Sequence, residues 1–190
     1  GEITGAVETF SDNTKQMMTR RKNEQLEKTA FSDQLTKVGN RRHIEMRLKS
    51  ELSMYHDSGN PFGLLFIDAD HFKSINDTFG HAVGDIALCM IANTLHYSLR
   101  DADTLGRWGG EEFIVLLNNI SANDLETIAK KLLFLISESR YDTESGAVSL
   151  TASIGATMVT KDDNSESLIS RADKLMYESK ENGRNRVTFG

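Results

Sequence analysis

The stretch RWGGEEF at residues 107–113 says most about how this chain folds. Its glycine pair, Gly109 and Gly110, lies between two strand-like runs. Because glycine accepts positive φ, the pair predicts the tight turn of a β-hairpin. Glu111 and Glu112 follow at once, and two adjacent like charges are tolerated more easily when a cation neutralises them. Taken alone, the pattern favours a solvated turn with ordinary surface acids.

A second acidic element, GLLFIDAD at residues 63–70, changes that balance. Its run of consecutive apolar residues predicts a strand that is buried on both faces. The strand leads directly into Asp68 and Asp70, where a carboxylate is held rigidly and is partly desolvated. On its own, Asp68 fits a loop-starting acid as well as a metal ligand. Together with the acidic hairpin it predicts a divalent cation site, since Mg²⁺ uses one or two carboxylates plus waters and substrate phosphates.

Further motifs extend the pattern along most of the chain. They are, in order, Asp33-Gln34-Leu35-Thr36, Asn40-Arg41-Arg42, FIDADHFK at 66–73, Asn76-Asp77, Phe79-Gly80-His81, Gly84-Asp85, Ser153-Ile154-Gly155, Ala172-Asp173-Lys174 and Gly183-Arg184-Asn185. With GGEEF at 109–113 as the signature, the chain resembles the GGDEF family of diguanylate cyclases over residues 32–190. One departure is Lys37-Val38, which replaces the family's usual Gly-Leu near a turn.

The resemblance implies the palm-like fold of nucleotidyl cyclases, in which helices flank a central, mainly antiparallel sheet. The pattern along the chain agrees with an α+β class, because helices and hairpins interleave around one sheet. The expected helices are one at 41–56 that stops at 57–61, a short helix with a loop at 71–80, a core helix at 85–99, a helix capped by Ser121 and Asp124 that runs to 138, and one at 165–182. A half-buried strand is expected at 148–158 and an edge strand at 187–189.

Residues 1–31 precede the region of resemblance and are interpreted as a separate segment. Good helix formers dominate it, and Ile3, Phe10 and Met17 recur every seven residues. A partly polar heptad of this kind predicts a helix that packs on the domain or pairs with its copy in a second chain. A frayed helical linker explains the same composition equally well. We therefore expect a helical extension at 1–31 and a catalytic domain at 32–190.

Composition and charge restrict the partners and the compartment that we expect for this chain. The 190 residues carry a net charge of −6, which disfavours non-specific binding of nucleic acid. No apolar run reaches the length of a membrane span, so we expect no direct membrane contact from these residues. The single cysteine, Cys89, cannot form an internal disulfide, which is consistent with a reducing compartment. These features predict a cytoplasmic location, as a free protein or as the output domain of a larger, membrane-anchored one.

The family resemblance implies a metal-dependent condensation of two GTP molecules into cyclic di-GMP, with loss of two pyrophosphates. By matching position it assigns Asp68, the Ala69 carbonyl and Glu111 as metal ligands, with Glu112 as a further ligand. Mg²⁺ is the expected ion, with Mn²⁺ as a substitute. Glu111 and Glu112 are the expected catalytic acids, and Glu111 is the candidate general base. The sequence leaves open which carboxylate takes the proton.

The triphosphate needs a binding device other than a P-loop, because the chain has no G-x-x-x-x-G-K-[ST] motif. Residues 71–73 follow the acidic strand, where a turn into a helix would present free backbone N–H groups. Lys180 and Arg184, taken alone, complement a helix C-terminus, whereas the resemblance implies contacts to terminal phosphates. The GTP-binding residues expected outside the guanine pocket are His71, Phe72, Lys73, His81, Gly109, Gly110, Lys180 and Arg184.

Two residues are candidates for selecting guanine over adenine. Guanine offers two N–H donors on one edge, and one carboxylate can accept from both, whereas adenine has no such pair. Asp85 and Asn76 match the family's guanine-binding residues. Without the resemblance, Asp85 is interpreted as an acid near a helix N-terminus and Asn76 as an asparagine in a loop. Sites built on such hydrogen bonds can reject the wrong analogue by up to ~10⁴-fold.

The chemistry also predicts partners and regulation. Each domain would hold one GTP, so the product requires two domains that face each other in a C2 homodimer, which the N-terminal helix would bring together. Arg100 and Asp103 form an R-x-x-D pair that, taken alone, describes a local ion pair. In the family this spacing marks an inhibitory site for cyclic di-GMP, and Lys131 stands where a second arginine is common. Lysine lacks arginine's bidentate fork, which implies weaker inhibition.

Three functions fit these observations to different degrees. An active cyclase requires metal, guanine and phosphate residues together, and the chain has a candidate for each. A silent domain that senses GTP or cyclic di-GMP usually has a damaged signature. A structural dimerisation domain has no need of the acidic cluster. The sequence therefore favours the enzyme.

Overall fold

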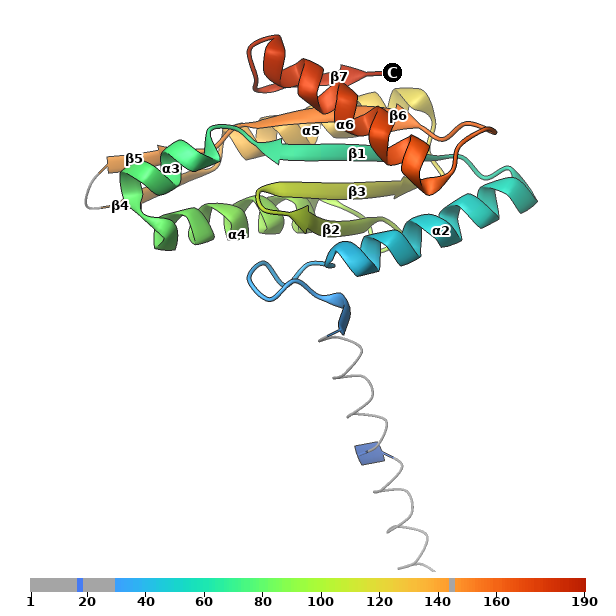
Figure 1. Cartoon of the computed structure of the whole chain (residues 1–190), viewed down its shortest axis with the longest axis horizontal. Helices are drawn as coiled ribbons and strands as arrows, with labels where there is room; N and C mark the ends of the chain where they lie inside the picture. The colour runs from blue at the N-terminus through green and yellow to red at the C-terminus, as the bar shows by residue number, and fades with distance from the viewer. Residues whose placement is uncertain (1–16, 19–29, 144–145) are drawn as a thin grey trace, which may run out of the picture.

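Five strands form the central sheet, in the spatial order β2-β3-β1-β6-β7 (Figure 1). The computed structural model describes residues 17–18, 30–143 and 146–190. Within this sheet the β6–β7 pair is parallel and the other neighbours are antiparallel. The strands are β1 (Phe62–Ala69), β2 (Thr104–Gly109), β3 (Glu112–Asn118), β6 (Ala152–Met158) and β7 (Arg186–Phe189). The expected α+β fold with a mainly antiparallel sheet is confirmed, as are the hairpin turn at Gly109–Gly110 and the last edge strand.

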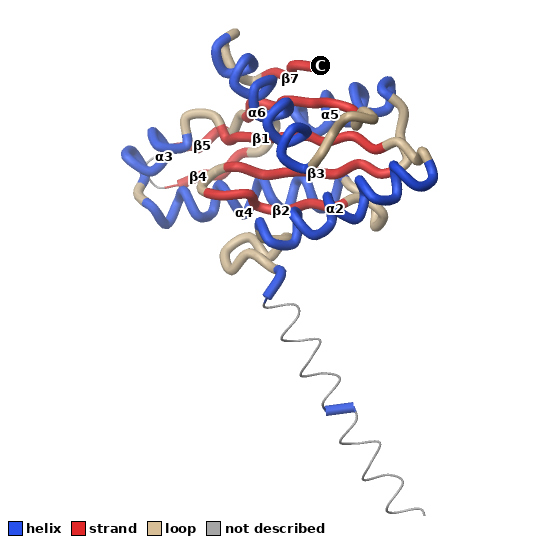
Figure 2. Tube along the Cα trace, turned by 45° about the vertical axis from the view of Figure 1, so that its right-hand side comes forward, coloured by secondary structure: helices blue, strands red, loops and turns tan. Residues whose placement is uncertain are grey.

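Helices cover both faces of this sheet. They are α2 (Arg41–Ser58), α3 (Phe72–Phe79), α4 (His81–Ser98), α5 (Ala122–Ser137) and α6 (Ser165–Glu181). Helices α2 and α6 lie on one face, and α4 and α5 lie on the other (Figures 1 and 2). Successive residues of β1 serve opposite faces, since Leu64 packs in the α2–α6 cluster and Leu65 packs in the α4–α5 cluster. The sheet is therefore buried on both sides.

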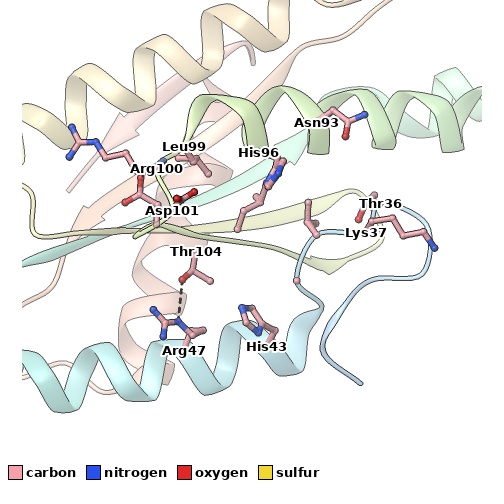
Figure 3. A pocket seen from close by; sticks show the side chains of 14 residues that line it. Thr36, Lys37, His43, Arg47, Asn93, His96, Leu99, Arg100, Asp101 and Thr104 are labelled. Carbon is pink, nitrogen blue, oxygen red and sulfur yellow. Dashed lines mark hydrogen bonds between the residues drawn. The ribbon is translucent and has the colours of Figure 1, made fainter. Parts of the chain in front are cut away.

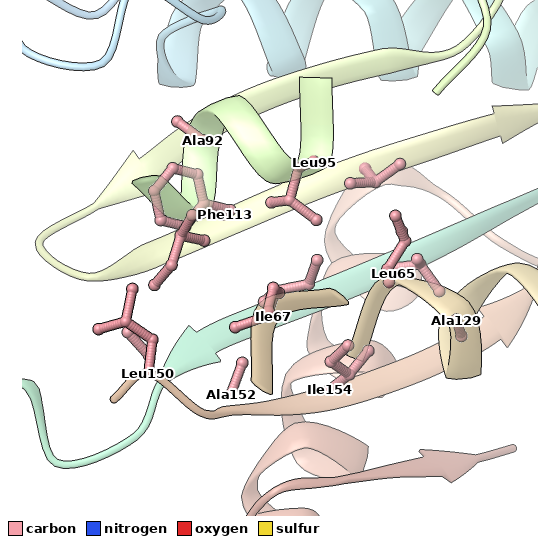
Figure 4. Close-up of a cluster of buried hydrophobic side chains, with 14 of the residues drawn as sticks. Leu65, Ile67, Ala92, Leu95, Phe113, Ala129, Leu150, Ala152 and Ile154 are labelled. Carbon is pink, nitrogen blue, oxygen red and sulfur yellow. The ribbon is translucent and has the colours of Figure 1, made fainter. Parts of the chain in front are cut away.

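The larger core cluster lies between the sheet and the helices α4 and α5 (Figure 4). Ile67, Phe113 and Ile154 come from three neighbouring strands, and Leu95 and Ala129 come from the covering helices. All five side chains are completely buried. Because interiors are packed as densely as organic crystals, this cluster holds the ends of β1 and β3 in place. Those ends carry the acidic residues.

The segment at 148–158 differs from the sequence-based expectation. It forms two strands, since β5 (Gly146–Ser149) pairs with β4 (Arg140–Thr143) in a separate two-stranded sheet before β6 begins. The prediction of a half-buried strand was wrong, because β6 packs against α5 and α6 and is buried along almost its whole length. Its polar positions, among them Ser153 and Thr157, are small residues under α6 and not solvent-facing ones.

Local sequence patterns predicted most helix ends correctly. The expected capping box at the start of α5 is present: the Ser121 hydroxyl accepts from the Asp124 N–H, and the Asp124 carboxylate accepts from Ser121. Helix α2 stops at Gly59, which has a φ of 74° in the left-handed region. Helix α4 starts at His81, four residues before the expected start at Asp85. The guanine candidate Asp85 therefore lies inside the helix.

Most of the N-terminal segment at 1–31 lies outside the described residues, including Ile3 and Phe10. Met17 and Met18 are helical and exposed. The paired-helix interpretation of this segment stays a prediction. No helix in the described ranges is long and apolar enough to cross a bilayer.

The loop at 32–40 attaches to the β2 edge of the sheet. Gly39 forms a parallel bridge with Gly106, and a Cβ on Gly39 would lie 2.9 Å from the Leu105 carbonyl oxygen. Lys37 has a φ of 63°, in the left-handed region. Glycine adopts this conformation without strain, which gives a physical reason for the family's usual glycine at this position.

Candidate active site

The three expected catalytic and metal-binding acids gather at one end of the sheet, where β1 ends and the β2–β3 hairpin turns. Asp68 and Glu112 are direct partners in the antiparallel register of β1 and β3. The Ala69 N–H donates to the Glu111 carbonyl at 3.2 Å, and Gly110 has a φ of 47° at the hairpin turn. The sequence predicted that the acids of the strand end and the hairpin would lie together, and the register of β1 and β3 brings them together.

The electrostatics of this end favour a positive ion. Burial raises the pKa of Asp68, the Lys180 ammonium at 2.8 Å lowers it, and the charges of Glu111 and Asp70 raise it further. Burial likewise raises the pKa of Glu112, and the nearby charges of Asp68, Asp173 and Glu111 add to that effect. One lysine therefore faces several carboxylates, so added positive charge would stabilise the ionised forms. We refer to Asp68, Glu111 and Glu112 as the acid cluster.

The donor set fits a hard divalent cation. In the described ranges no three carboxylate, imidazole or thiol groups already converge as a ready-made metal cage. Mg²⁺ does not need one, because it binds through one or two carboxylates and keeps waters and substrate phosphates as its other ligands. Mn²⁺ accepts the same carboxylate and carbonyl oxygens. The groups that would hold the ion are the acid cluster and the Ala69 carbonyl.

The second acid of the hairpin, Glu112, also borders an open cavity. This cavity of about 690 Å³ lies between α2 and α6, and Asp173 and Trp108 line it together with Glu112. The Arg41 guanidinium lies 4.2 Å from the centre of the Trp108 ring, a cation–π contact on the wall of the cavity. The influence of Asp173 on Glu112 was not anticipated from the sequence, because helix α6 brings it there from 61 residues downstream.

The guanine candidates lie together where α3 packs on α4. The Asn76 side-chain oxygen presses directly against Gly84, at the position that a Cβ would occupy, and Phe72 lies on the same glycine. Any larger residue at Gly84 would displace Asn76. Asp85 follows Gly84 and is exposed. The expected pair, Asn76 and Asp85, is therefore brought together, and the Gly-Asp motif has a steric reason.

The phosphate candidates lie at the starts of α3 and α4 and at the C-terminal end of α6. His71 precedes α3 with a φ of 56°, and Lys73 is exposed in the first turn of that helix. His81 is exposed at the start of α4. Lys180 is ion-paired to Asp68, while Arg184 has a φ of 62° in the turn after α6. The C-terminal end of α6 and the start of α3 lie at the same end of the sheet (Figure 1).

Asp70 anchors this region, a role that sequence reasoning missed. Its carboxylate accepts hydrogen bonds from the Thr151 hydroxyl at 2.8 Å, the Ser153 hydroxyl at 2.7 Å and the Asn185 N–H at 3.0 Å. It therefore ties β1 to β6 and to the turn that carries Arg184. The two hydroxyl residues flanking the start of β6 are a weak sequence signal for such an acceptor.

The R-x-x-D pair lies apart from the acid cluster, at the far end of α4. Asp103 accepts from the Arg100 N–H at 3.0 Å and from the Asn118 N–H at 3.2 Å, so it shapes the turn before β2. A cavity of about 650 Å³ opens beside it, between α2, the loop at 36–39 and α4 (Figure 3). Described residues that line it are Thr36, Lys37, Val38, Gly39, His43, Arg47, Asn93, His96, Leu99, Arg100, Asp101, Asp103, Thr104 and Leu105.

Lys131, the expected second cation, lies elsewhere. It is exposed on α5 and is not among the described residues that line this cavity. Arg100 lines the cavity, and its charge lowers the pKa of Asp124 on α5, after the larger effect of the Ser121 hydrogen bonds. Arg100 therefore borders the cavity and also influences the start of α5.

A mainly antiparallel sheet with acids at a strand end and on a hairpin tip defines a palm-type nucleotidyl cyclase domain. The family model described as "Diguanylate cyclase, GGDEF domain" matches residues 30–186. Diguanylate cyclase A of Treponema denticola is 39% identical over 171 residues, which cover 88% of this chain and 46% of that protein. The chain belongs to the GGDEF family of diguanylate cyclases.

Solved structures agree with this assignment. The coiled coil and GGDEF domain of DgcB from Caulobacter crescentus, in complex with c-di-GMP, matches with a TM-score of 0.88 and 27% identity, covering 98% of this chain and all of that one. Diguanylate cyclase SiaD from Pseudomonas aeruginosa, in complex with its activator SiaC, matches with a TM-score of 0.85 and 33% identity, covering 98% of this chain and 71% of that one. The chain spans less than half the length of the relatives compared by sequence.

Proposed function

We propose that this chain condenses two GTP molecules into cyclic di-GMP and releases two pyrophosphates. The observation that carries the proposal is the acid cluster. Burial raises the pKa values of the buried Asp68 and the half-buried Glu112, and these two acids stand with Glu111 at the sheet end that also holds Lys180. Such an arrangement suits a metal–triphosphate complex, whose cation would offset the carboxylates. The guanine candidates on α3 and α4 add a reason for GTP as the nucleotide.

In the proposed reaction the 3′-hydroxyl of each GTP attacks the α-phosphate of the other. The divalent ion, when bound, lowers the pKa of the attacking hydroxyl and neutralises charge on the leaving pyrophosphate. Glu111 takes the proton from the hydroxyl. Lys180 and Arg184 bind the terminal phosphates, and backbone N–H groups at 71–73 and at Gly109–Gly110 bind the others. Movement of Lys180 from Asp68 to a phosphate would free Asp68 for the ion.

Selection of guanine depends on Asp85 and Asn76 in this proposal. The Asp85 carboxylate accepts from the two donors on guanine's edge, and Asn76 bonds the same base. Adenine would leave the carboxylate facing an acceptor. We expect the resulting preference for GTP over ATP to reach at least ~10²-fold.

The product requires two domains, and we propose that residues 1–31 bring them together as a paired helix. The heptad positions Ile3, Phe10 and Met17 motivate this proposal, and the coiled coil in the DgcB structure supports it by similarity. GTP as the substrate makes the cytoplasm the expected location. Neither nucleic acid nor lipid is needed as a partner.

We further propose that cyclic di-GMP inhibits the enzyme at Arg100 and Asp103 without competing with GTP. Arginine can bind a phosphate and a guanine edge, and Asp103 can accept from guanine. Lys131, exposed on α5 and outside the cavity beside Asp103, is the proposed second cation. We expect Arg100→Ala to abolish inhibition and preserve synthesis, and Lys131→Arg to tighten binding. Calorimetry with cyclic di-GMP on the three proteins tests this.

Incubation of the full chain with GTP and Mg²⁺, with chromatographic identification of the product, tests the main proposal. We expect cyclic di-GMP and two equivalents of pyrophosphate, and no cyclic product from ATP. Addition of EDTA should stop the reaction, and Mn²⁺ should restore it. Binding of GTP without turnover at any protein concentration would instead identify a nucleotide-sensing domain.

A further inference from the structure

We propose that Arg107, held in place by Asp33, is a positioning residue that fixes the hairpin tip so that Glu111 faces the metal site. This inference rests on the proposed function, because it concerns how an acid of that reaction is oriented. Arg107 lies on β2, three residues before Gly110 and 74 residues from Asp33. Sequence spacing gives no hint that the three residues meet.

The contacts of Arg107 converge on a single backbone oxygen of the tip. Its Nε and Nη2 atoms donate to the Gly110 carbonyl at 2.9 Å and 2.6 Å, and its Nη1 atom donates to Asp33 Oδ1 at 3.2 Å. The guanidinium therefore bridges the Gly110 carbonyl and the Asp33 carboxylate. Its planar fork suits this geometry, whereas a lysine ammonium in its place would not make the same two bonds to one carbonyl and a third to a carboxylate.

The Gly110 carbonyl belongs to the peptide unit whose N–H is that of Glu111, so its orientation sets where the Glu111 side chain begins. The next carbonyl, that of Glu111 itself, accepts from the Ala69 N–H at 3.2 Å. Consecutive peptides of the tip are thus held from opposite sides, by Arg107 and by β1. Gly110 has no side chain to restrict its dihedrals, so the arginine fork adds a restraint on the rotation of the first peptide.

Asp33 is itself firmly anchored. It accepts from the Thr36 N–H at 2.9 Å and the Thr36 hydroxyl at 2.7 Å. Burial disfavours the ionised form, but these bonds and the charge of Arg107 leave its pKa lowered. The same loop is bonded along β2, since the Gly39 N–H donates to the Leu105 carbonyl at 3.1 Å and the Gly39 carbonyl accepts from the Arg107 N–H at 2.8 Å. Movement of this loop would therefore reach the tip through Arg107.

A second arginine–aspartate pair supplies a matched control. Arg171 donates to Asp163 through two nitrogens at 2.8 Å and 2.7 Å and also bonds the Thr157 hydroxyl and the Met158 carbonyl. It joins β6 to the loop before α6, and among the described residues it makes no hydrogen bond to the hairpin. Loss of its fork should affect the fold without affecting the tip.

The test compares Arg107→Lys, Asp33→Asn and Arg171→Lys in the full chain. For Arg107→Lys we expect kcat to fall about 10²-fold, the loss typical of a misplaced catalytic group, while KM for GTP changes by less than about threefold. Asp33→Asn should lower kcat by roughly tenfold, since it acts through Arg107. Arg171→Lys should lower Tm and leave kcat within about twofold of wild type.

A readout other than turnover separates this inference from the proposed function. Mn²⁺ binding, measured by electron paramagnetic resonance with a non-hydrolysable GTP analogue present, should weaken about tenfold in Arg107→Lys and stay unchanged in Arg171→Lys. If wild type made no cyclic di-GMP, the proposed function would fail while this binding test still applied. The positioning role would be overturned if Arg107→Lys kept the wild-type Mn²⁺ affinity and its kcat were no lower than that of Arg171→Lys. Because Arg107→Lys can also destabilise the fold, Tm is recorded for all variants. If Arg107→Lys lowers Tm, the positioning role requires that Asp33→Asn also weakens Mn²⁺ binding.

Discussion

Asp68 and Asp70 lie two residues apart at the end of β1, and both are 4% exposed, yet their surroundings differ completely. Asp70 accepts hydrogen bonds from two hydroxyls and one backbone N–H. Asp68 has the Lys180 ammonium on one side and the like charges of Glu111 and Asp70 nearby, and burial raises its pKa. One carboxylate is surrounded by donors, and the other belongs to a cluster of acids.

This difference separates an anchoring acid from a cation-binding acid. A buried carboxylate whose oxygens are satisfied by fixed donors stabilises the fold and has little capacity left for a ligand. A cluster of acids around a buried carboxylate that is only partly neutralised destabilises the fold until a cation binds. The stability of the fold should therefore respond in opposite ways to loss of charge in the acid cluster and at the Asp70 anchor, which Glu112→Gln and Asp70→Asn can test.

The largest effect is expected for Glu111→Gln, which removes the charge of the proposed base and metal ligand while keeping its size. We expect cyclic di-GMP synthesis to fall by at least about 10³-fold, because both the proton acceptor and a ligand are lost. Tm should stay within about 3 °C of wild type. Product chromatography and thermal unfolding measure the two quantities. Normal synthesis by the folded variant would remove Glu111 from the site.

Asp85→Ala tests base selection by the guanine candidates on α3 and α4. We expect GTP affinity to fall by roughly 10²-fold, because a carboxylate that meets two guanine donors is lost, while ATP affinity stays unchanged. Titration of both nucleotides measures the effect, and Asp57→Ala, at an exposed acid near the end of α2, is the control. Equal losses for GTP and ATP would assign Asp85 to folding or phosphate binding.

Asp70→Asn tests the anchor. The amide keeps one acceptor oxygen but turns an NH₂ group toward donors, so we expect a loss of about 2–3 kcal/mol in the free energy of unfolding. For a domain of this size that corresponds to a fall in Tm of roughly 4–12 °C. The KM for GTP should also rise, because the turn that carries Arg184 is released. Thermal unfolding that matches wild type would show that Asp70 is not an anchor.

Glu112→Gln should have the smallest effect on stability, and in the opposite direction. The folded pKa of Glu112 is raised above its usual 4.5, so ionisation costs more in the folded than in the unfolded state. That cost is fully present above the folded pKa and disappears below the unfolded pKa. We therefore expect a gain in Tm of roughly 1–3 °C at pH 7 without divalent ions, and no gain near pH 4.

The control for this variant is the addition of Mg²⁺ at pH 7. Wild type should gain more in Tm than Glu112→Gln, because the ion relieves the repulsion that the variant has already lost. A loss of stability in Glu112→Gln at pH 7, similar to that of Asp70→Asn, would contradict the distinction between the acid cluster and the anchor.

The sequence by itself determined the features that depend on neighbouring residues. Gly109–Gly110 specified the hairpin turn, the apolar run before Asp68 specified a buried strand, and Ser121 with Asp124 specified the start of α5. These features were predictable because turn dihedrals, hydrophobic periodicity and capping are local physics. The motif order also identified the family. The roles of individual site residues stay predictions.

Tertiary structure decided what depends on contacts between distant residues. Asp70 meets Asn185 across 115 positions, and Arg107 meets Asp33 across 74. The alternation along β6 looked like a half-buried strand because Ser153 is polar, but Ser153 is buried and donates to Asp70. A pattern of polar and apolar residues indicates which side chains share a face of a strand. Which helix covers a face, and which carboxylate receives a buried hydroxyl, depends on how the whole sheet packs.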